Sequence, residues 1–436
     1  SLYQDHFFLW LPILPQEVYL FDVCRENMFD GEHWPCSVVS PSLAVTVGIY
    51  DDPANQTQEP LVIDLSSNGN LAICGSTVSG KSTFMQTLLY AFVNKYSPDQ
   101  VNIYVLDYSN HLQAPFAELC HCGGVVFDNE PDKTEKLFVL LSDIIAERKR
   151  MFQGGSYPQF VIANGFTVPY IILAIDNYAG FREKTENKYE SDLLVLSREG
   201  VSYGVFLVVT SGGFGAGELQ NRIADNFRFA LCLEMGDKFK YAEVLRTHHI
   251  DVLPESNVKG RGIANINGRV LEFQTALAFK ASDDYARTEK LVTCFGEMNR
   301  SWHGKCARKI PTIPTNPDWD DFLTYIDTGD AHIRTEGLLP FGWNTRSASV
   351  VSIDLSRTYC WLISGKARTG KTNLLKVLAS SAALCDSDRF IFDFAQKLQK
   401  FAEENQAKYI SDSRSLFDVL KALIPQFKER NRKKQE

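Results

Sequence analysis

The sequence has no apolar stretch long enough to cross a membrane. A spanning helix needs about 20 consecutive apolar residues, and the longest apolar runs here, Tyr170–Ile175 and Val205–Thr210, have the length of strands. The first residues, Ser1 to Asp5, also lack the charged start and apolar core of a signal peptide. We therefore expect a soluble fragment, and a membrane anchor of its parent chain would lie outside it.

The ten cysteines follow neither a disulfide pattern nor a zinc pattern. Cys120 and Cys122 flank His121, but this cluster offers too few ligands at the wrong spacing for structural zinc, and no second pair completes it. We predict reduced thiols, as in a cytosolic compartment. Cys74 and Cys360 lie in strand-like apolar runs, which predicts that both are core residues.

An excess of basic residues is also missing. The chain has 45 Lys and Arg against 53 Asp and Glu, a formal net charge of −8. Proteins that bind nucleic acids usually carry a basic footprint that neutralises phosphates. The basic run Lys428–Lys434 is read most simply as the solvated face of a helix. We therefore expect no DNA binding.

What the sequence does contain is two phosphate-binding loops of the Walker A type, G-x-x-x-x-G-K-[ST], 290 residues apart. Each follows an apolar run and precedes a helical pattern, which is the context that aims loop N–H groups and a helix N-terminus at phosphates. The first loop comprises Gly75, Ser76, Thr77, Val78, Ser79, Gly80, Lys81 and Ser82. The second comprises Gly365, Lys366, Ala367, Arg368, Thr369, Gly370, Lys371 and Thr372. We predict that both bind nucleoside triphosphates, with ATP as the ligand.

The similarity between the two halves extends beyond the loops. The run Ile63–Leu65 recurs as Ile353–Leu355, and the strand pattern ending at Asp107 recurs in one ending at Asp393. A period near 290 residues indicates tandem domains rather than a solenoid, whose repeats are far shorter. The predicted domains are a first P-loop module over 1–305 with its core at about 46–285, a Pro-rich linker over 306–337, and the incomplete start of a second module over 338–436.

The alternation of apolar strands with helical stretches in the first module predicts an α/β fold of the RecA-like P-loop NTPase type. Its sheet should be mostly parallel and flanked by helices. Helices are expected over Ser82–Tyr96, Thr134–Phe152 and Lys240–Arg246.

The remaining parts of a nucleotide site can be sought in the same module. Val168–Asp176 is a buried-strand pattern that ends in an acid, typical of a Walker B strand. We predict that Asp176 holds Mg²⁺ through water opposite the hydroxyl of Ser82, and that Thr372 is the matching metal ligand of the second loop. The strand ending at Thr210 and Ser211 is a candidate γ-phosphate sensor.

Two departures from active ATPases bear on catalysis. Asn177 stands at the usual position of a catalytic Glu, and an amide cannot accept a proton from the attacking water. Val78 stands where many motors have Gly, at a backbone position that is costly for a β-branched residue. We find no confident catalytic residue and predict weak turnover or none. Arg198, Arg222 and Arg261 are only candidates for an arginine finger.

The chain resembles the FtsK/SpoIIIE family of ATPases, and more narrowly the multi-module ATPases of type VII (ESX/Ess) secretion systems. The resemblance rests on Trp10–Pro15, on Val47–Gln58 before the first loop, and on Arg198–Gly200, Gly260–Gly262 and Phe273–Gln274. It covers nearly the whole chain. Two modules in one chain correspond to the second module and the start of the third in such proteins.

This resemblance implies further properties that the residue pattern does not establish. It implies a membrane-anchored parent chain, a site of action at the cytoplasmic face of the membrane, contact with other modules of the same chain, and hexameric assembly. It also implies export of small helical WXG-type proteins. Two alternatives stay open: a DNA translocase of the same family, and a nucleotide-stabilised regulatory module without a motor cycle.

Overall fold

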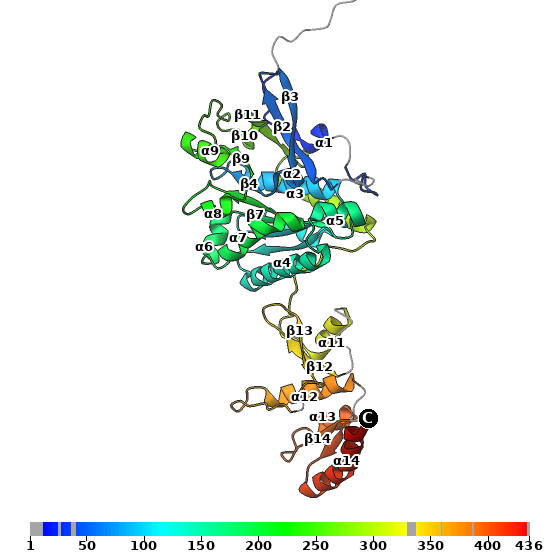
Figure 1. The fold of residues 1–436 in the computed structure, drawn as a ribbon. Coiled ribbons are helices and arrows are strands. Elements are labelled where there is room, and N and C mark those ends of the chain that lie inside the picture. Colours follow the sequence, from blue (N-terminus) through cyan, green and yellow to red (C-terminus); the bar gives the residue numbers. More distant parts are fainter. Residues whose placement is uncertain are drawn as a thin grey trace, which may run out of the picture. The chain divides into compact units, whose positions relative to one another are not determined.

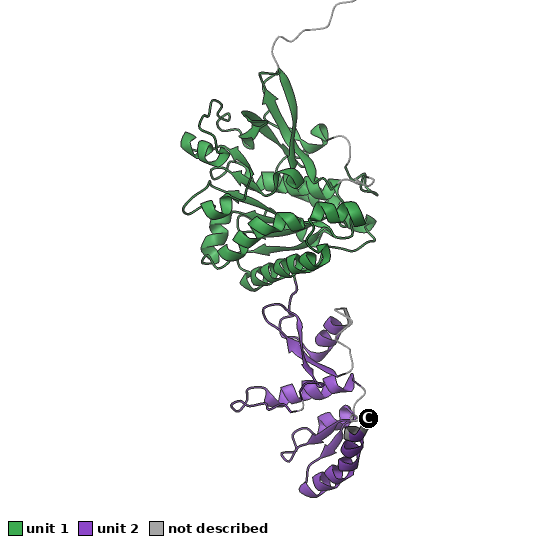
Figure 2. Ribbon diagram, viewed as in Figure 1, with its two compact units in different colours: residues 1–310 green, residues 311–436 purple. Residues whose placement is uncertain are grey.

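The computed structural model describes residues 12–24, 28–35, 41–328, 337–358, 360–385 and 388–433. They form two compact units, residues 1–310 and 311–436, which are coloured separately in Figure 2. The first residues of the Trp10–Pro15 motif, residues 329–336 of the predicted linker, and Lys434 of the basic run lie outside the described residues.

The first unit is built on an eleven-stranded sheet (Figure 1). Its strand order is β3-β2-β11-β10-β9-β4-β8-β7-β5-β6, and β1 pairs with β11 in addition. The strands are β1 (Val18–Tyr19), β2 (Ala44–Asp52), β3 (Thr57–Asp64), β4 (Leu71–Cys74), β5 (Val101–Asp107), β6 (Cys122–Phe127), β7 (Tyr170–Asp176), β8 (Val205–Ser211), β9 (Phe229–Leu233), β10 (Arg261–Ile266) and β11 (Arg269–Leu277).

The predicted fold class is confirmed, because the strands from β6 through β5, β7, β8 and β4 to β9 are all parallel. The other part of the sheet is different. β10, β11, β2 and β3 pair with antiparallel neighbours, so the sheet is mixed. β2 and β3 are only partly buried, as in antiparallel sheets with an exposed face, whereas β5, β7 and β8 are buried along their whole length.

Helices cover both faces of the parallel part, and each face has its own hydrophobic core. One core joins the sheet to α3 (Lys81–Lys95), α5 (Tyr157–Asn164) and α10 (Asp284–Ser301). The other joins it to α4 (Pro131–Phe152), α6 (Tyr178–Lys184), α7 (Glu190–Glu199), α8 (Asn221–Ala224) and α9 (Lys238–Leu245). Successive strand residues alternate between the two cores, as the period of two requires. Short helices α1 (Leu20–Val23) and α2 (Leu65–Asn68) complete this unit.

The register of the parallel strands brings their polar ends together at one edge. Asp107 at the end of β5 lies directly beside Asp176 at the end of β7. Cys74, the last residue before the first loop, lies beside Ser211 of β8 and Cys232 of β9. Ligands of open α/β sheets bind outside these carboxyl ends, so the topology places the first loop where a ligand site is expected.

Residues 306–310 lie along β6, the last strand at this side of the sheet. Their backbone N–H groups at Ala307 and Ile310 donate to the carbonyl oxygens of Cys120 and Gly123, at 2.8 and 2.9 Å. The Tyr104 hydroxyl donates to the Arg308 carbonyl oxygen at 2.7 Å. The sequence assigned this segment to the linker, whereas in the structure it packs on the first unit.

The second unit contains two separate two-stranded ladders. β12 (Leu338–Trp343) pairs antiparallel with β13 (Val350–Asp354), and β14 (Phe390–Phe392) pairs parallel with β15 (Lys408–Ile410). Its helices are α11 (Trp319–Thr328), α12 (Lys371–Ala383), α13 (Gln399–Glu404) and α14 (Ser413–Lys433).

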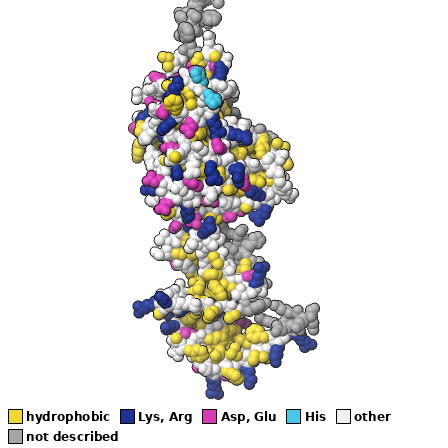
Figure 3. All heavy atoms as spheres, turned by 60° about the vertical axis from the view of Figure 1, so that its left-hand side comes forward, with side chains coloured by type: hydrophobic (Ala, Val, Ile, Leu, Met, Phe, Trp, Pro, Cys, Tyr) yellow, Lys and Arg dark blue, Asp and Glu magenta, His cyan; other side chains and the backbone are white. Residues whose placement is uncertain are grey.

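The prediction of two buried cysteines is right for one and wrong for the other. Cys74 is fully buried in β4, which has β8 and β9 on its two sides. Cys360 is exposed, and residues 360–363 are not a strand. The physical reason is that the described part of the second unit has no strands that pair with this segment, so its apolar side chains stay uncovered. Leu362 is 88% exposed, and Figure 3 shows hydrophobic side chains gathered on one face of this unit.

Candidate nucleotide-binding site

The first loop joins β4 to α3, as predicted, and its lysine folds back over it. The ammonium group of Lys81 donates to the carbonyl oxygens of Gly75 and Ser76, both at 2.7 Å. Gly80 immediately precedes α3 with a φ of 103°, a conformation that glycine adopts without a steric penalty. The ammonium therefore lies inside the curve of the loop, where it can neutralise phosphate charge.

Neighbouring strand ends hold the loop on both sides. The N–H of Gly75 donates to the Ser211 carbonyl at 3.1 Å, and the N–H of Ser76 donates to the Glu234 carbonyl at 2.8 Å. A Cβ at Gly75 would lie only 2.5 Å from the Ser79 hydroxyl oxygen. Glycine at this position therefore allows the tight curve. The loop is a fixed cradle rather than a loose surface turn.

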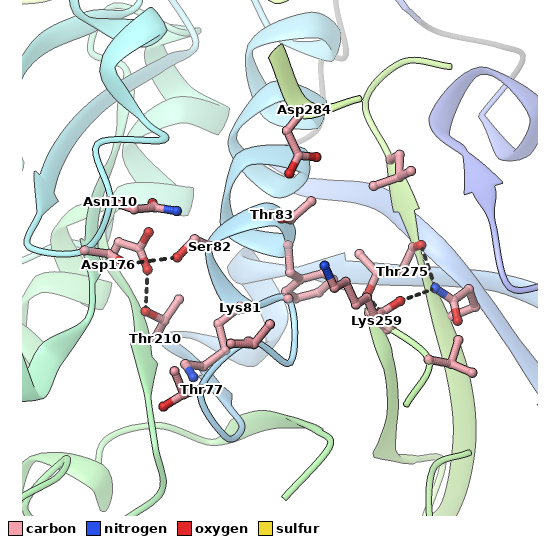
Figure 4. Close-up of a pocket in the computed structure, with 18 of the residues that line it drawn as sticks. Thr77, Lys81, Ser82, Thr83, Asn110, Asp176, Thr210, Lys259, Thr275 and Asp284 are labelled. Carbon is pink, nitrogen blue, oxygen red and sulfur yellow. Dashed lines mark hydrogen bonds between the residues drawn. The ribbon is translucent and has the colours of Figure 1, made fainter. Parts of the chain in front are cut away.

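Asp176 lies at the end of β7 and joins three other parts of the site. The Thr210 hydroxyl donates to its carboxylate at 2.6 Å, and Ser82 forms a second hydrogen bond with it (Figure 4). Burial raises the pKa of Asp176, and the nearby Asp107 carboxylate adds to this, while the bonds from Thr210 and Ser82 oppose it. A buried carboxylate in contact with the loop hydroxyl is the arrangement predicted for the Walker B acid.

Nearby carboxylates also affect the pKa of the loop lysine, Lys81. Burial lowers the pKa of the Lys81 ammonium, and the carboxylates of Asp176 and Glu218 oppose that shift. Glu218 is itself fixed, since one of its oxygens accepts from the Gly212 N–H and from the Ser211 hydroxyl, both at 2.8 Å. Glu218 could not be recognised from sequence alone, because it follows β8 in an irregular glycine-rich segment.

The loop opens onto a cavity of about 680 Å³. Besides the loop, Asp176, Asn177 and Thr210, its walls include residues that sequence reasoning did not assign to the site (Figure 4). These are Gln16, Glu17, Ser109, Asn110, Asn257, Val258, Lys259, Gly260, Gln274, Thr275, Leu277, Asp284 and Arg287, with Thr83 and Phe84 from α3. The sequence signal for part of this wall was present in the Gly260–Gly262 and Phe273–Gln274 motifs.

The segment 257–260 is bonded directly to the loop. The Gly260 N–H donates to the Ser79 carbonyl at 3.0 Å, and the Thr275 N–H and hydroxyl both donate to the Gly260 carbonyl, at 2.9 and 2.8 Å. The Gln274 amide donates to the Lys259 carbonyl at 3.0 Å. The antiparallel strand β11 thus supports one wall of the cavity, which explains why the site needs more than the parallel part of the sheet.

Asn177 has a structural role that its sequence position did not reveal. Its backbone has a φ of 65° and it caps α6, with its side-chain oxygen accepting from the Gly180 N–H at 3.2 Å. Its side-chain amide donates to the Tyr108 carbonyl at 2.9 Å, and its N–H donates to the Thr210 hydroxyl at 2.7 Å. Both ends of the amide are therefore engaged within the protein.

None of the three arginine-finger candidates lines the described cavity. Arg261 is only 1% exposed and donates to Gln274 and to the Leu14 and Pro15 carbonyls, so it cannot reach a neighbouring site. Arg198 is exposed and paired with Glu199 at 3.1 Å. Arg222 lies on α8. The proposal for Arg261 is wrong because a motif arginine between two glycines can equally be a buried support.

The second loop repeats the geometry of the first. Lys371 donates to the carbonyl oxygens of Gly365 at 2.7 Å and Lys366 at 2.5 Å. Gly370 precedes α12 with a φ of 89°. Arg368 has a φ of 65°, close to the 68° of Val78 at the matching position. Both lysines therefore fold back over their loops, but the second loop is largely exposed.

The donor set of the first site fits Mg²⁺ bound together with a nucleotide. Mg²⁺ prefers oxygen ligands and commonly keeps several waters, and Ser82 and Asp176 place a hydroxyl and a carboxylate side by side. The described residues contain no grouping of three or more His, Cys, Asp or Glu side chains that could hold a metal ion by itself. The structure thus brings together Lys81, Ser82, Asp176 and Thr210, all of which the sequence had singled out.

The sequence model of the FtsK/SpoIIIE family matches residues 46–157, which contain the first loop and the strands around it. This stretch of the chain is therefore similar to the FtsK/SpoIIIE family. Among curated proteins, it is similar to the type VII secretion system protein EssC of Staphylococcus aureus, at 24% identity over 94% of this chain and 27% of that protein. It is also similar to the ESX secretion system protein EccC of Geobacillus thermodenitrificans, at 26% identity over 80% of this chain and 23% of that protein.

The chain therefore spans about a quarter of the length of these two relatives. Solved structures share its fold. EssC ATPases 2 and 3 from G. thermodenitrificans give a TM-score of 0.76 at 22% identity, covering 97% of this chain and 78% of that one. EccC ATPases 2 and 3 from Thermomonospora curvata, in complex with a signal sequence peptide, give 0.67 at 23% identity, covering 95% and 76%. No helix among the described residues combines the length and apolar character needed to cross a bilayer.

Proposed function

We propose that this chain is an ATP-binding tandem segment of a type VII secretion motor, and that its first module binds Mg²⁺–ATP with little or no hydrolysis. The observation that carries the proposal is the joint placement of Lys81, Ser82, Asp176 and Thr210 on one cavity of about 680 Å³. The similarity to EssC and EccC supports the assignment to secretion.

Each residue has a definite part in binding. The Lys81 ammonium neutralises the β- and γ-phosphates, while N–H groups of the loop and of the first turn of α3 donate to their oxygens. Ser82 and Asp176 would hold Mg²⁺, which supplies charge neutralisation on the phosphates. Thr210 keeps the Asp176 carboxylate oriented through its 2.6 Å hydrogen bond.

Weak hydrolysis follows from the position after Asp176. A general base there is worth roughly 10²–10⁴-fold in rate, and the Asn177 amide has no proton-accepting group of suitable basicity. Its donor and acceptor are already bonded to Tyr108 and Gly180. The first module would then use nucleotide to stabilise one conformation or to act on neighbouring modules rather than to drive a rapid cycle.

The partners belong to the proposal as well. We place the chain at the cytoplasmic face of the membrane, in a membrane-anchored and hexameric parent protein, acting on small helical WXG-type substrates. The peptide complex of the T. curvata EccC ATPases supports a protein substrate. The acidic balance of the chain, a net charge of −8, disfavours a duplex DNA substrate.

Calorimetric titration of Mg²⁺–ATP into the chain and its Lys81→Ala variant tests the binding site. We expect the variant to lose at least tenfold in affinity for the first site, because a charge-assisted contact to phosphate is removed. Lys188→Ala, an exposed lysine paired with Glu135, serves as a charge-matched control and should bind normally. Equal affinity of parent and Lys81→Ala would exclude this loop as the site.

Two further measurements separate the function classes. Steady-state phosphate release should stay near background, and rapid release abolished by Lys81→Ala would contradict the weakly hydrolytic assignment. Titration with random duplex DNA at about physiological salt should show no binding. Sub-micromolar affinity with a steep salt dependence would favour a DNA translocase. A pull-down with small helical-hairpin proteins, using a chain that includes the complete last module, tests the proposed substrate.

A further inference from the structure

The cavity continues past the phosphate loop to a second polar end. There its wall is formed by Gln16, Glu17, Leu277, Asp284 and Arg287. These residues come from the N-terminal arm around β1, from β11 and from the first turn of α10. None of these residues belongs to the phosphate loop. If a nucleotide occupies the cavity, a part of it other than the phosphates would lie at this end.

The N-terminal arm is a fixed wall rather than a loose tail. β1 pairs in parallel with β11, with Val18 opposite Ala276. Just before it, the buried guanidinium of Arg261 donates to the carbonyl oxygens of Leu14 and Pro15, at 2.9 and 3.2 Å. The arm is therefore bonded at two places on either side of Gln16 and Glu17.

Asp284 is the first residue of α10 and presents its carboxylate to the open cavity. Its side chain is 79% exposed, and Figure 4 shows it directed toward the side of α3 that carries Thr83. Its Oδ1 accepts from Nη1 of Arg287 at 2.5 Å. An ionised carboxylate has about four acceptor positions, so this bond leaves capacity for donors on a ligand.

Arg287 supplies an independent sign that a ligand completes this end. It is more than nine-tenths buried and lines the cavity. Its Nε–H has no hydrogen-bond partner in the described structure. Buried polar groups without partners are rare in native proteins, and each calls for an explanation. An oxygen-rich ligand placed between α3 and α10 offers the acceptors that this arginine lacks.

The position of the phosphates decides which part of a nucleotide reaches Asp284. Lys81 and Ser82 hold the β- and γ-phosphates at the loop, and Thr83 is the next residue along α3 on the cavity wall. The cavity continues beyond Thr83 to Asp284 and Arg287, so a nucleoside attached to these phosphates has room to extend toward α10. The ribose carries two vicinal hydroxyl donors, which match an exposed carboxylate held in place by a buried arginine.

We propose that Asp284, positioned by Arg287, recognises the ribose hydroxyls of the bound nucleotide, so that the first module selects ribonucleotides over deoxyribonucleotides. This inference rests on the proposed nucleotide site. Asp284 contacts the ligand directly. Arg287 is a positioning residue that fixes the carboxylate through the 2.5 Å bond.

The test compares ATP, 2′-deoxyATP and 3′-deoxyATP by calorimetry on the unaltered chain and on Asp284→Ala. The unaltered chain should bind ATP about tenfold or more tightly than at least one deoxynucleotide, the cost of losing a hydrogen bond to a charged group. Asp284→Ala should bind all three nucleotides with similar affinity. Glu289→Ala removes an exposed acid from the same helix outside the cavity, and should keep the discrimination.

Three results have distinct meanings. Equal binding of ATP and both deoxynucleotides by the unaltered chain overturns the ribose proposal, and this comparison needs no folded variant. Unchanged discrimination in a folded Asp284→Ala variant overturns the role of Asp284. Absence of ATP binding by the unaltered chain, or binding that is insensitive to Lys81→Ala, instead rejects the nucleotide site on which the inference rests.

Discussion

The side-chain amide of Asn177 donates a 2.9 Å hydrogen bond to the carbonyl oxygen of Tyr108. This bond ties the residue after the Walker B acid to the segment that follows β5, next to Asp107. The carboxyl ends of two adjacent parallel strands are thereby linked through the position that carries the catalytic Glu in many P-loop ATPases. Asn177 has become part of the scaffold of the site.

Replacing Asn177 with Glu is therefore expected to leave hydrolysis near background. Glu cannot donate to the Tyr108 carbonyl, and it fits the left-handed backbone at φ 65° less well than Asn. We expect the free energy of unfolding to fall by about 1 kcal/mol through the weakened cap. Asn177→Asp keeps the capping oxygen and should lose less. Phosphate release and urea unfolding measure both effects. A gain in turnover of about a hundredfold by Asn177→Glu would show that the missing base alone limits hydrolysis, and would contradict the scaffold role of Asn177.

Val78 should be a site of stored backbone strain. It has a φ of 68° and is 74% exposed, so its β-branched side chain gains little packing to offset an unfavourable conformation. A non-glycine residue held there costs about 1–3 kcal/mol, and glycine removes that cost at an entropic expense of about 0.5–1 kcal/mol. Val78→Gly should stabilise the fold by about 1 kcal/mol in urea unfolding.

The matched control is Val62→Gly on β3, another exposed valine but one in extended backbone. It should destabilise by about 1 kcal/mol, because glycine weakens a strand without relieving strain. If both changes alter stability in the same direction, Val78 carries no strain that matters to the fold.

Asp176 gives the stability a defined pH dependence. Its pKa in the folded protein is raised from 3.8, chiefly by burial. Its contribution to stability is therefore greatest below pH 3.8 and is lost as pH rises through the folded pKa. Asp176→Asn keeps an acceptor for Thr210 and removes the buried charge. Relative to the parent, the variant should gain stability as the pH rises from 3.8 through the folded pKa of Asp176. Urea unfolding at a series of pH values measures this, and a difference that does not change with pH would refute it.

Arg261 should matter for stability rather than for turnover. It is 1% exposed and bonded to Gln274 and to the N-terminal arm. Arg261→Ala leaves the Leu14 carbonyl and the Gln274 side-chain oxygen without this donor, so we expect a loss of about 1–3 kcal/mol in the free energy of unfolding. Arg198→Ala, at an exposed arginine with a surface partner, should change it by less than about 0.5 kcal/mol. Similar effects of the two changes would show that the buried contacts contribute little.

The sequence was sufficient for the parts of the site that follow from local pattern. Lys81 and Ser82 lie where the loop motif places them, and Asp176 and Thr210 end two neighbouring buried strands. Each of these assignments depends on an apolar strand of known direction that ends at a polar residue. These features can be predicted because the residue pattern of a buried strand and the start of a helix depend on neighbouring residues in the sequence.

The other wall of the site could not be predicted in this way. Asp284 and Arg287 reach the cavity from a helix more than 200 residues after the loop, and Gln16 reaches it from the N-terminal arm. Their placement depends on the antiparallel pairing of β10 and β11 and on the attachment of β1, which no single segment encodes. The prediction that Cys360 is a core residue was wrong for a related reason. An apolar strand segment is buried only when other strands pair with it on both sides.

Residues 306–310 also have a consequence for how the first unit behaves as a separate protein. A sheet edge with unpaired backbone groups is a template on which another chain can add a strand. In this chain, residues 306–310 cover part of the β6 edge. Gly123 and Gly124 make this possible, because a side chain at either position would collide with Arg308 or Ile310. A fragment that ends at residue 305 would expose the backbone groups of this edge, and we expect it to self-associate. A fragment of the first module should therefore extend past Ile310.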